Sequence, residues 1–342
     1  MTTMTFDPSA PALPGSGVFG LPHGEAEAAL VLVPVPYEAT TSYGGGCARG
    51  PEAILAASRQ VDLFDVETGR PYEKGIHMIP LPEEIRNLGR TARAAAAPVI
   101  AAGGTGGSPA LVRAAAEVDE ACQRVNAWVE DRVAGLLRAG KQVGVVGGDH
   151  STALGSLAAH ARRHPGMGVL HVDAHADLRV AYEGFKYSHA SVMYNAAGRL
   201  PEIARIVQVG VRDLSEEEHA FAAGSGGRIL QHLDADLARA RLEGETWASQ
   251  VQRLLGPLPH EVYVSFDIDG LEPDLCPHTG TPVPGGLSFA EATYLLAAVV
   301  RSGRRMVGFD LVEVAPDPTG GEWDGNVGAR LLYKLAGWAL HG

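Results

Sequence analysis

The chain has 342 residues, of which 46% are hydrophobic and 20% are charged, and its 43 glycines and 22 prolines follow no collagen-like period. This composition is typical of a globular protein with many loops and a large core, and it excludes wholesale disorder. The formal net charge is −12, and no run of Lys or Arg is present. These features argue against a nucleic-acid-binding protein and favour ligands of positive charge.

The cysteines and the N-terminal segment indicate the compartment. Cys47, Cys122 and Cys276 lie far apart and outside any CxxC pattern, so neither a disulfide framework nor a cysteine zinc site is indicated. The first 15 residues lack the basic and apolar regions of a signal peptide, and no later stretch reaches the roughly 18 apolar residues of a membrane span. We therefore expect a soluble cytoplasmic protein that makes no membrane contact.

The first quarter of the chain predicts an arm, a strand and a short helix. Residues 1–27 are rich in Pro and Gly without periodicity, which indicates an irregular N-terminal arm. Residues 28–35 have the length and β-branched content of a strand. The glycine-rich loop of residues 40–51 lacks the GxxxxGK[ST] and GxGxxG spacings, so a nucleotide-binding loop is disfavoured, and residues 52–59 have helical spacing.

The rest of the chain predicts alternating strands and helices. Residues 62–109 are rich in Pro, Gly and Ala, which predicts a flexible excursion or lid inserted in a single domain over residues 1–342. Residues 110–140 predict one long amphipathic helix. Further strands are expected over residues 143–146, 168–174, 205–211, 261–269 and 306–314, and further helices over residues 152–163, before Pro257, and over 289–301 and 326–340. This alternation predicts a three-layer α/β/α sandwich with a central, mainly parallel sheet.

Ionisable residues concentrate where these strands end, which is where parallel sheets bind ligands. Asp173, His175 and Asp177 are spaced two apart, so in extended chain their side chains project to one side. Burying carboxylates together costs several kcal/mol per charge unless a cation compensates. A solvated edge strand fits poorly with the apolar run of residues 168–172. The pattern therefore predicts a metal site.

A second carboxylate pair, Asp267 and Asp269, also ends an apolar strand, and His150 follows the strand of residues 143–146. An EF-hand is disfavoured because Gly270 occupies the fourth position rather than the sixth when Asp267 is counted as the first. A phosphatase with an aspartyl nucleophile remains open on this pair alone, and His150 alone is typical of an ordinary loop histidine. Two imidazoles and four carboxylates together suit two Mn²⁺ ions, with Ni²⁺ also possible, and predict metal-activated hydrolysis.

Several motifs together resemble the ureohydrolase (arginase/agmatinase) family, with agmatinase-like members closest. The motifs are VPVPYEATTSYGGGCARGPEAI at 33–54, GGDHS at 147–151, DAHADL at 173–178, SFDIDGLEPD at 265–274, TGTPVPGGLS at 279–288 and EVAP at 313–316. The resemblance implies one metal held by His150, Asp173, Asp177 and Asp267, and another held by Asp173, His175, Asp267 and Asp269. It also implies release of urea and an amine from a guanidino group, and a homo-oligomer, either a trimer or a hexamer.

The resemblance further implies roles for individual side chains. Glu313 is expected to bind the guanidinium, and His189 to pass a proton to the leaving amine. Asp177 is expected to accept a proton from hydroxide and to orient the tetrahedral intermediate. Glu183 is a candidate partner for the distal ammonium of agmatine, with an ordinary loop glutamate as the alternative. Residues 178–187 lack the Asn and Ser groups with which arginases hold the amino acid, which disfavours arginine.

We therefore expect a hydrolase of agmatine or a similar small cationic guanidino compound. One alternative within the same family is a hydrolase of guanidine or of a substituted guanidine or biguanide, which would apply if residues 62–109 closed over the pocket. An alternative of another class is a catalytically silent subunit that pairs with an active partner.

Overall fold

The computed structural model of this protein describes residues 6–13 and 15–341. Within this part of the chain, one eight-stranded sheet has the order β2-β1-β3-β8-β7-β4-β5-β6, and every pairing in it is parallel. The strands are β1 (Leu30–Val35), β2 (Ile76–Met78), β3 (Gln142–Gly147), β4 (Gly168–Val172), β5 (Arg205–Val211), β6 (Ile229–Leu233), β7 (Glu261–Asp267) and β8 (Arg305–Val312). The predicted parallel sheet is confirmed.

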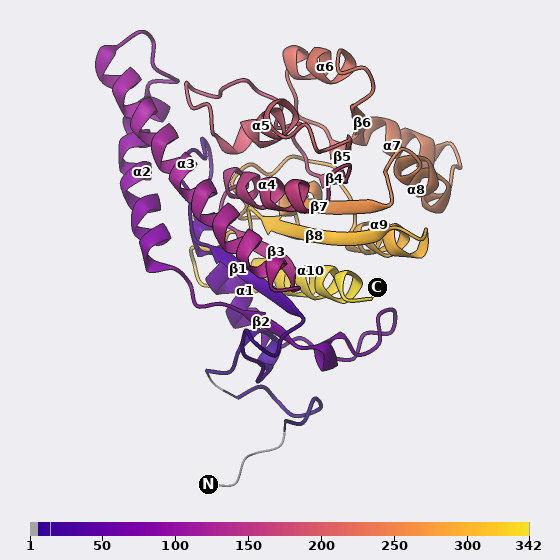
Figure 1. The fold of residues 1–342 in the computed structure, drawn as a ribbon. Helices are drawn as coiled ribbons and strands as arrows, with labels where there is room; N and C mark the ends of the chain where they lie inside the picture. The colour runs from indigo at the N-terminus through magenta and orange to yellow at the C-terminus, as the bar shows by residue number, and fades with distance from the viewer. Residues whose placement is uncertain (1–5, 14, 342) are drawn as a thin grey trace.

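Helices cover both faces of this sheet (Figure 1). They are α1 (Gly50–Ser58), α2 (Glu83–Ala101), α3 (Pro109–Arg138), α4 (Ala153–Arg163), α5 (Val192–Arg199), α6 (Glu216–Ala223), α7 (Asp234–Leu242), α8 (Trp247–Leu255), α9 (Phe289–Arg301) and α10 (Trp323–Ala339). Apolar residues of α1, α8, α9 and α10 share one core with the sheet, whereas α2 and α3 share a second core and α4 and α5 a third. The predicted three-layer α/β/α sandwich is therefore confirmed.

Strand β1 contributes side chains to the cores on both faces of the sheet. All six of its residues are buried. Leu30 and Leu32 belong to the core under α1 and α10, whereas Val31 and Val33 belong to the core under α2 and α3. Because successive side chains of a strand point to opposite faces, a continuous apolar run is what a sheet covered on both sides requires.

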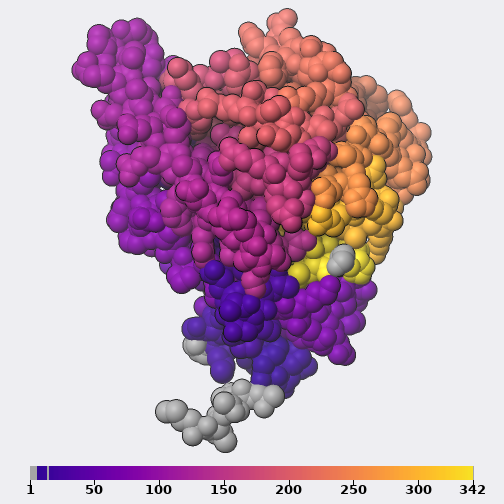
Figure 2. Space-filling model, viewed as in Figure 1, coloured from indigo at the N-terminus to yellow at the C-terminus, as the bar shows by residue number. Residues whose placement is uncertain are grey.

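The prediction of a flexible excursion over residues 62–109 is wrong for most of that segment. It contains the edge strand β2 and the 19-residue helix α2, which packs against α3 and buries Ala92, Ala96 and Val99. Alanine is the strongest helix former, and its small side chain allows close packing, so an Ala-rich stretch that reads as loose in sequence becomes a regular helix. In the space-filling view, the α2–α3 hairpin forms one flank of the molecule and projects at its tip (Figure 2).

Other differences concern the arm and the C-terminal half. Residues 1–5 and residue 14 of the predicted arm lie outside the described residues, but Val18, Phe19 and Leu21 are buried, and the Phe19 ring lies 4.8 Å from that of Tyr333. The sequence pattern did not predict β6, α5, α6 or α7. No described helix has both the length and the apolarity that crossing a bilayer requires.

Candidate metal centre

Four adjacent strands deliver the candidate site. In the sheet order β3-β8-β7-β4, His150 follows β3, Glu313 follows β8, Asp267 ends β7 and Asp173 follows β4. Because the strands are parallel, their carboxyl ends meet at one edge of the sheet. The structure therefore brings together residues that lie up to 163 positions apart, as in the hydrogen bond from the backbone N–H of His150 to Glu313.

The first group of candidate ligands surrounds His150. Its Nδ1 atom lies 3.1 Å from Asp173 Oδ2, 3.1 Å from Asp177 Oδ2 and 3.2 Å from Asp267 Oδ2. All four side chains are at most 5% exposed. A second group adjoins the first, because His175 Nδ1 lies 3.1 Å from Asp269 Oδ2 and 3.4 Å from Asp173 Oδ1. Asp173 thus lies between the two groups.

The hydrogen bonds of His150 indicate which kind of ion this site can bind. The Ser265 hydroxyl donates to Asp310 at 3.0 Å, so its oxygen accepts from His150 Nε2–H, which lies 3.0 Å away. In the neutral ring, Nδ1 then carries a lone pair, and this buried atom has no hydrogen-bond partner among the described residues. Three carboxylates around this atom need a cation beside it. In the metal-free site this cation is a proton, since the carboxylates raise the pKa of His150 well above its usual range although burial opposes it, and a metal ion can replace it. The donor set fits divalent metal ions, because two such ions balance the four aspartates.

The pKa values of the carboxylates reflect this crowding. Burial, followed by the charges of Asp269 and Asp173, raises the pKa of Asp267 well above its usual range. Burial and the charge of Asp173 raise the pKa of Asp177 to about 6. Although burial opposes it, the neighbouring His171 and His150 hold the pKa of Asp173 well below its usual range. Several buried negative charges in one place favour binding of cations.

Four buried side chains behind the candidate ligands were not predicted as part of the site. His171 Nε2–H donates to Asp173 Oδ2 at 2.8 Å, and Gln208 donates to the other ring nitrogen of His171 at 2.9 Å. Ser265 and Asp310 orient His150 as described above. Hydrogen bonds of this kind fix the orientation and tautomer of metal ligands. The sequence could have indicated His171, because it lies two residues before Asp173 and continues the two-residue spacing of Asp173, His175 and Asp177.

Glu313 lies beside the ligands with one free oxygen. Its Oε1 atom accepts the backbone N–H of His150 at 2.8 Å, whereas the buried Oε2 atom has no hydrogen-bond partner among the described residues. Burial, together with the charge of Asp149, raises the pKa of Glu313 well above its usual range. The backbone of Glu313 has φ 62° and that of Asp177 has φ 53°. This left-handed conformation is uncommon for residues other than glycine and is often found at functional sites.

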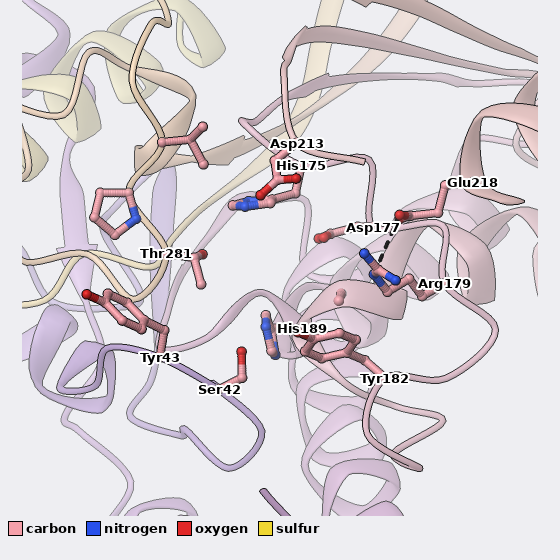
Figure 3. A pocket seen from close by; sticks show the side chains of 13 residues that line it. Ser42, Tyr43, His175, Asp177, Arg179, Tyr182, His189, Asp213, Glu218 and Thr281 are labelled. Atoms are coloured by element: carbon pink, nitrogen blue, oxygen red, sulfur yellow. Dashed lines mark ion pairs between the residues drawn. The ribbon is translucent and has the colours of Figure 1, made fainter. Parts of the chain in front are cut away.

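A cavity of about 290 Å³ opens beside the cluster. His175 and Asp177 line it next to His189, Tyr182 and Ser42 (Figure 3). The wall is completed by residues that include Tyr43, Arg179, Asp213, Glu218 and Thr281. His189 is buried, and burial, with the charges of His175 and His150, lowers its pKa to about 3.

Glu183 is not among the residues that line this cavity. Its backbone faces the turn between α2 and α3, at Gly104. The expected contact between Glu183 and the substrate therefore stays a prediction.

Comparisons with known proteins agree with this geometry. The model of the arginase family matches residues 28–337. The chain belongs to the arginase family. The N(1)-aminopropylagmatine ureohydrolase of Thermus thermophilus is 36% identical over 314 residues, which are 91% of this chain and 90% of that protein. The agmatinase of Sodalis glossinidius is 32% identical over 85% of this chain and 80% of its own length.

Solved structures show the same fold. The agmatine ureohydrolase of Thermoplasma volcanium matches with a TM-score of 0.71 at 22% identity, covering 95% of this chain and 94% of that one. The proclavaminate amidino hydrolase of Streptomyces clavuligerus matches with a TM-score of 0.71 at 23% identity, covering 97% and 99%. The resemblance found in the motifs is confirmed, and the protein is an enzyme of the ureohydrolase family with a His/Asp cluster suited to its dinuclear metal site.

Proposed function

We propose that this enzyme hydrolyses the guanidino C–N bond of agmatine or of an agmatine with a longer amine tail, and releases urea and the amine. The observation that carries the proposal is the bare Nδ1 of His150, which faces three buried carboxylates next to a cavity with acidic walls. When bound, two divalent cations lower the pKa of water towards neutrality and so supply a hydroxide nucleophile. Mn²⁺ is the metal that the ligand set favours, with Ni²⁺ as the alternative.

The residues of the chain bind the guanidinium and handle its protons. The free Oε2 of Glu313 is a hydrogen-bond acceptor for the N–H groups of a guanidinium, since charge-assisted contacts of this type are strong. Asp177 lines the cavity, where its carboxylate accepts a proton from hydroxide and orients the tetrahedral intermediate. His189 lines the cavity, and its imidazolium form donates the Nε2 proton to the leaving amine and returns to the neutral ring.

The charges around the cavity favour a substrate with a second cationic group. Glu218 is paired with Arg179, with 3.5 Å between Oε2 and Nε (Figure 3). Asp213 is exposed at the cavity and forms no ion pair within the described residues. A distal ammonium extending from the guanidino end therefore meets an available carboxylate at Asp213. The names of the two curated relatives, agmatinase and N(1)-aminopropylagmatine ureohydrolase, agree with such a tail.

Free guanidine is a weaker candidate, because none of the cavity-lining residues comes from the segment 62–109 that was expected to close over it. The complete ligand set also disfavours a silent subunit.

The test is urea release from agmatine, N(1)-aminopropylagmatine, guanidinobutyrate, arginine and guanidine, combined with elemental analysis of the purified protein. We expect the highest kcat/KM with agmatine or its aminopropyl derivative and about two metal ions per chain. Asp267→Ala should abolish both metal binding and urea release, whereas Asp236→Ala, on the exposed side of α7, should leave both unchanged. Absence of urea from all five compounds, or full turnover by Asp267→Ala, would contradict the proposal.

A further inference from the structure

Thr40 contacts His189 twice from the loop that follows β1. Its hydroxyl oxygen lies 3.1 Å from the backbone nitrogen of His189 and 3.0 Å from Nδ1 of the same residue. Thr40 is completely buried, and the two residues are 149 positions apart in the chain. The ring nitrogen that remains for the cavity is therefore Nε2.

The loop that carries Thr40 is held on both sides. Asp149 accepts the backbone N–H of Ala39 at 2.9 Å, which ties the loop to the segment that contains His150. From α2, the Arg93 guanidinium donates to the carbonyl of Ala39 at 3.1 Å and to that of Thr41 at 2.6 Å. Hydrogen bonds to its two neighbours, Ala39 and Thr41, thus hold Thr40 in place. Arg93, which makes two of these bonds, belongs to the segment 62–109.

The hydrogen-bond inventory of the hydroxyl determines how the imidazole is presented. The backbone N–H of His189 can only donate, so it occupies a lone pair of the Thr40 oxygen. Among residues 6–13 and 15–341, this hydroxyl makes one further hydrogen bond, and its partner is Nδ1 of His189. A buried donor without an acceptor is costly, so the hydroxyl proton points to Nδ1 in the neutral ring. Neutral His189 then carries its proton on Nε2, towards the cavity.

We propose that Thr40 is the positioning residue of His189, holding the imidazole so that Nε2 faces the leaving amine. The proton is transferred from the imidazolium form, in which Nδ1–H donates to the Thr40 oxygen while the Nε2 proton goes to the amine, so that the ring returns to the neutral state. The proposal rests on the proposed function, in which His189 passes a proton to that amine. It also assigns a role to α2, since Arg93 fixes the loop in which Thr40 lies. Neither role has a local sequence signal, because the contact joins two distant loops.

The experiment is a double-mutant cycle in urea release. Thr40→Val removes the hydroxyl at nearly constant volume, and we expect kcat to fall about tenfold with KM little changed, as for loss of one well-placed hydrogen bond. Thr40→Ser keeps the hydroxyl and should restore kcat to within about twofold of the wild type. In a His189→Ala background, Thr40→Val should lower kcat no further, because the two residues act as a unit.

The matched control is Thr41→Val, since the Thr41 hydroxyl is also buried but donates to Glu38 at 2.7 Å. The factor by which Thr41→Val changes kcat should be the same in the wild type and in the His189→Ala background. Metal content, measured by elemental analysis, should be equal in every variant. A loss of kcat by Thr40→Val that is unchanged in the His189→Ala background would overturn the proposal, as would wild-type kcat in Thr40→Val.

A second measurement separates this proposal from the proposed function. In ¹⁵N-histidine-labelled protein, the resonances of His189 are assigned by their loss in His189→Ala. We expect an unprotonated Nδ1 in the wild type and in Thr40→Ser, and a mixture of tautomers in Thr40→Val. A protonated Nδ1 in the neutral wild-type ring overturns the Thr40 proposal even if urea is released. Absence of urea release with the expected spectrum overturns only the proposed function.

Discussion

Replacing Asp177 by Asn should change the stability of this protein in opposite directions with and without bound metal. Asp177 is 4% exposed, and burial, followed by the charge of Asp173, raises its pKa from 3.8 to about 6. Since one pKa unit corresponds to about 1.36 kcal/mol, ionised Asp177 destabilises the metal-free fold by about 3 kcal/mol above pH 6. Asparagine has a similar size and no charge, so it removes most of this cost.

The pH dependence follows from which state of the protein holds the proton. Between pH 3.8 and about 6, the folded metal-free protein keeps a proton on Asp177 that the unfolded chain has lost. The free energy of unfolding therefore falls as the pH rises through this window. The advantage of Asp177→Asn over the wild type should be full above pH 6, about half as large at pH 5 and absent below about pH 4.

Thermal unfolding is the assay. With a chelator at neutral pH, the Tm of Asp177→Asn should rise by about 5 °C, since 1 kcal/mol shifts Tm by roughly 2 °C in a domain of this size. With saturating Mn²⁺ the wild type gains stability by mass action, whereas the variant lacks a ligand, gains much less and should melt below the wild type. Asp213→Asn, at an exposed carboxylate of the same cavity, is the control and should change neither Tm. A variant that is less stable than the wild type in chelator, or that keeps the full Mn²⁺ response, would refute the reasoning.

Two further substitutions test the substrate side of the site. Glu313→Gln keeps an acceptor for the His150 N–H but removes the charge. We expect kcat/KM for agmatine to fall about 100-fold with unchanged metal content, as for loss of two charge-assisted hydrogen bonds. Activity within about threefold of the wild type would contradict the role of Glu313. Arg93→Met should lower kcat about fivefold by releasing the loop of Thr40. Its control is Arg90→Met, since Arg90 is exposed on the same helix, and equal effects of the two substitutions would show that Arg93 acts only through the stability of α2.

The clustering of the candidate metal ligands could be predicted from the sequence because two short-range rules are enough to bring these side chains together. The two-residue spacing of Asp173, His175 and Asp177 puts their side chains on one side of extended chain. The parallel order of the strands then brings Asp267 and His150 to the same edge. Neither rule requires knowledge of side-chain packing.

The supporting contacts could not be predicted, since they depend on packing between distant segments. The bond between His150 and Ser265 spans 115 positions, and Arg93 reaches the loop of Thr40 from a helix whose sequence reads as a loose Ala-rich stretch. Glu183 is a different case, because its role stays a prediction. Its position in a motif-rich segment made it a candidate, but its side chain is absent from the cavity lining.

Three strand boundaries show how carboxylates of the candidate site change the local structure that the sequence pattern predicts. Three strands were predicted to end at residues 174, 269 and 314, and each ends two residues earlier, at Val172, Asp267 and Val312. Carboxylates cause the early ends, because Asp173 accepts the backbone N–H of His175 at 2.6 Å and Asp267 that of Asp269 at 2.9 Å. Such side-chain bonds compete with the sheet for the backbone. In the third strand, Glu313 leaves the sheet by adopting φ 62°. The same carboxylates therefore end the strands and place negative charge at the candidate cation site.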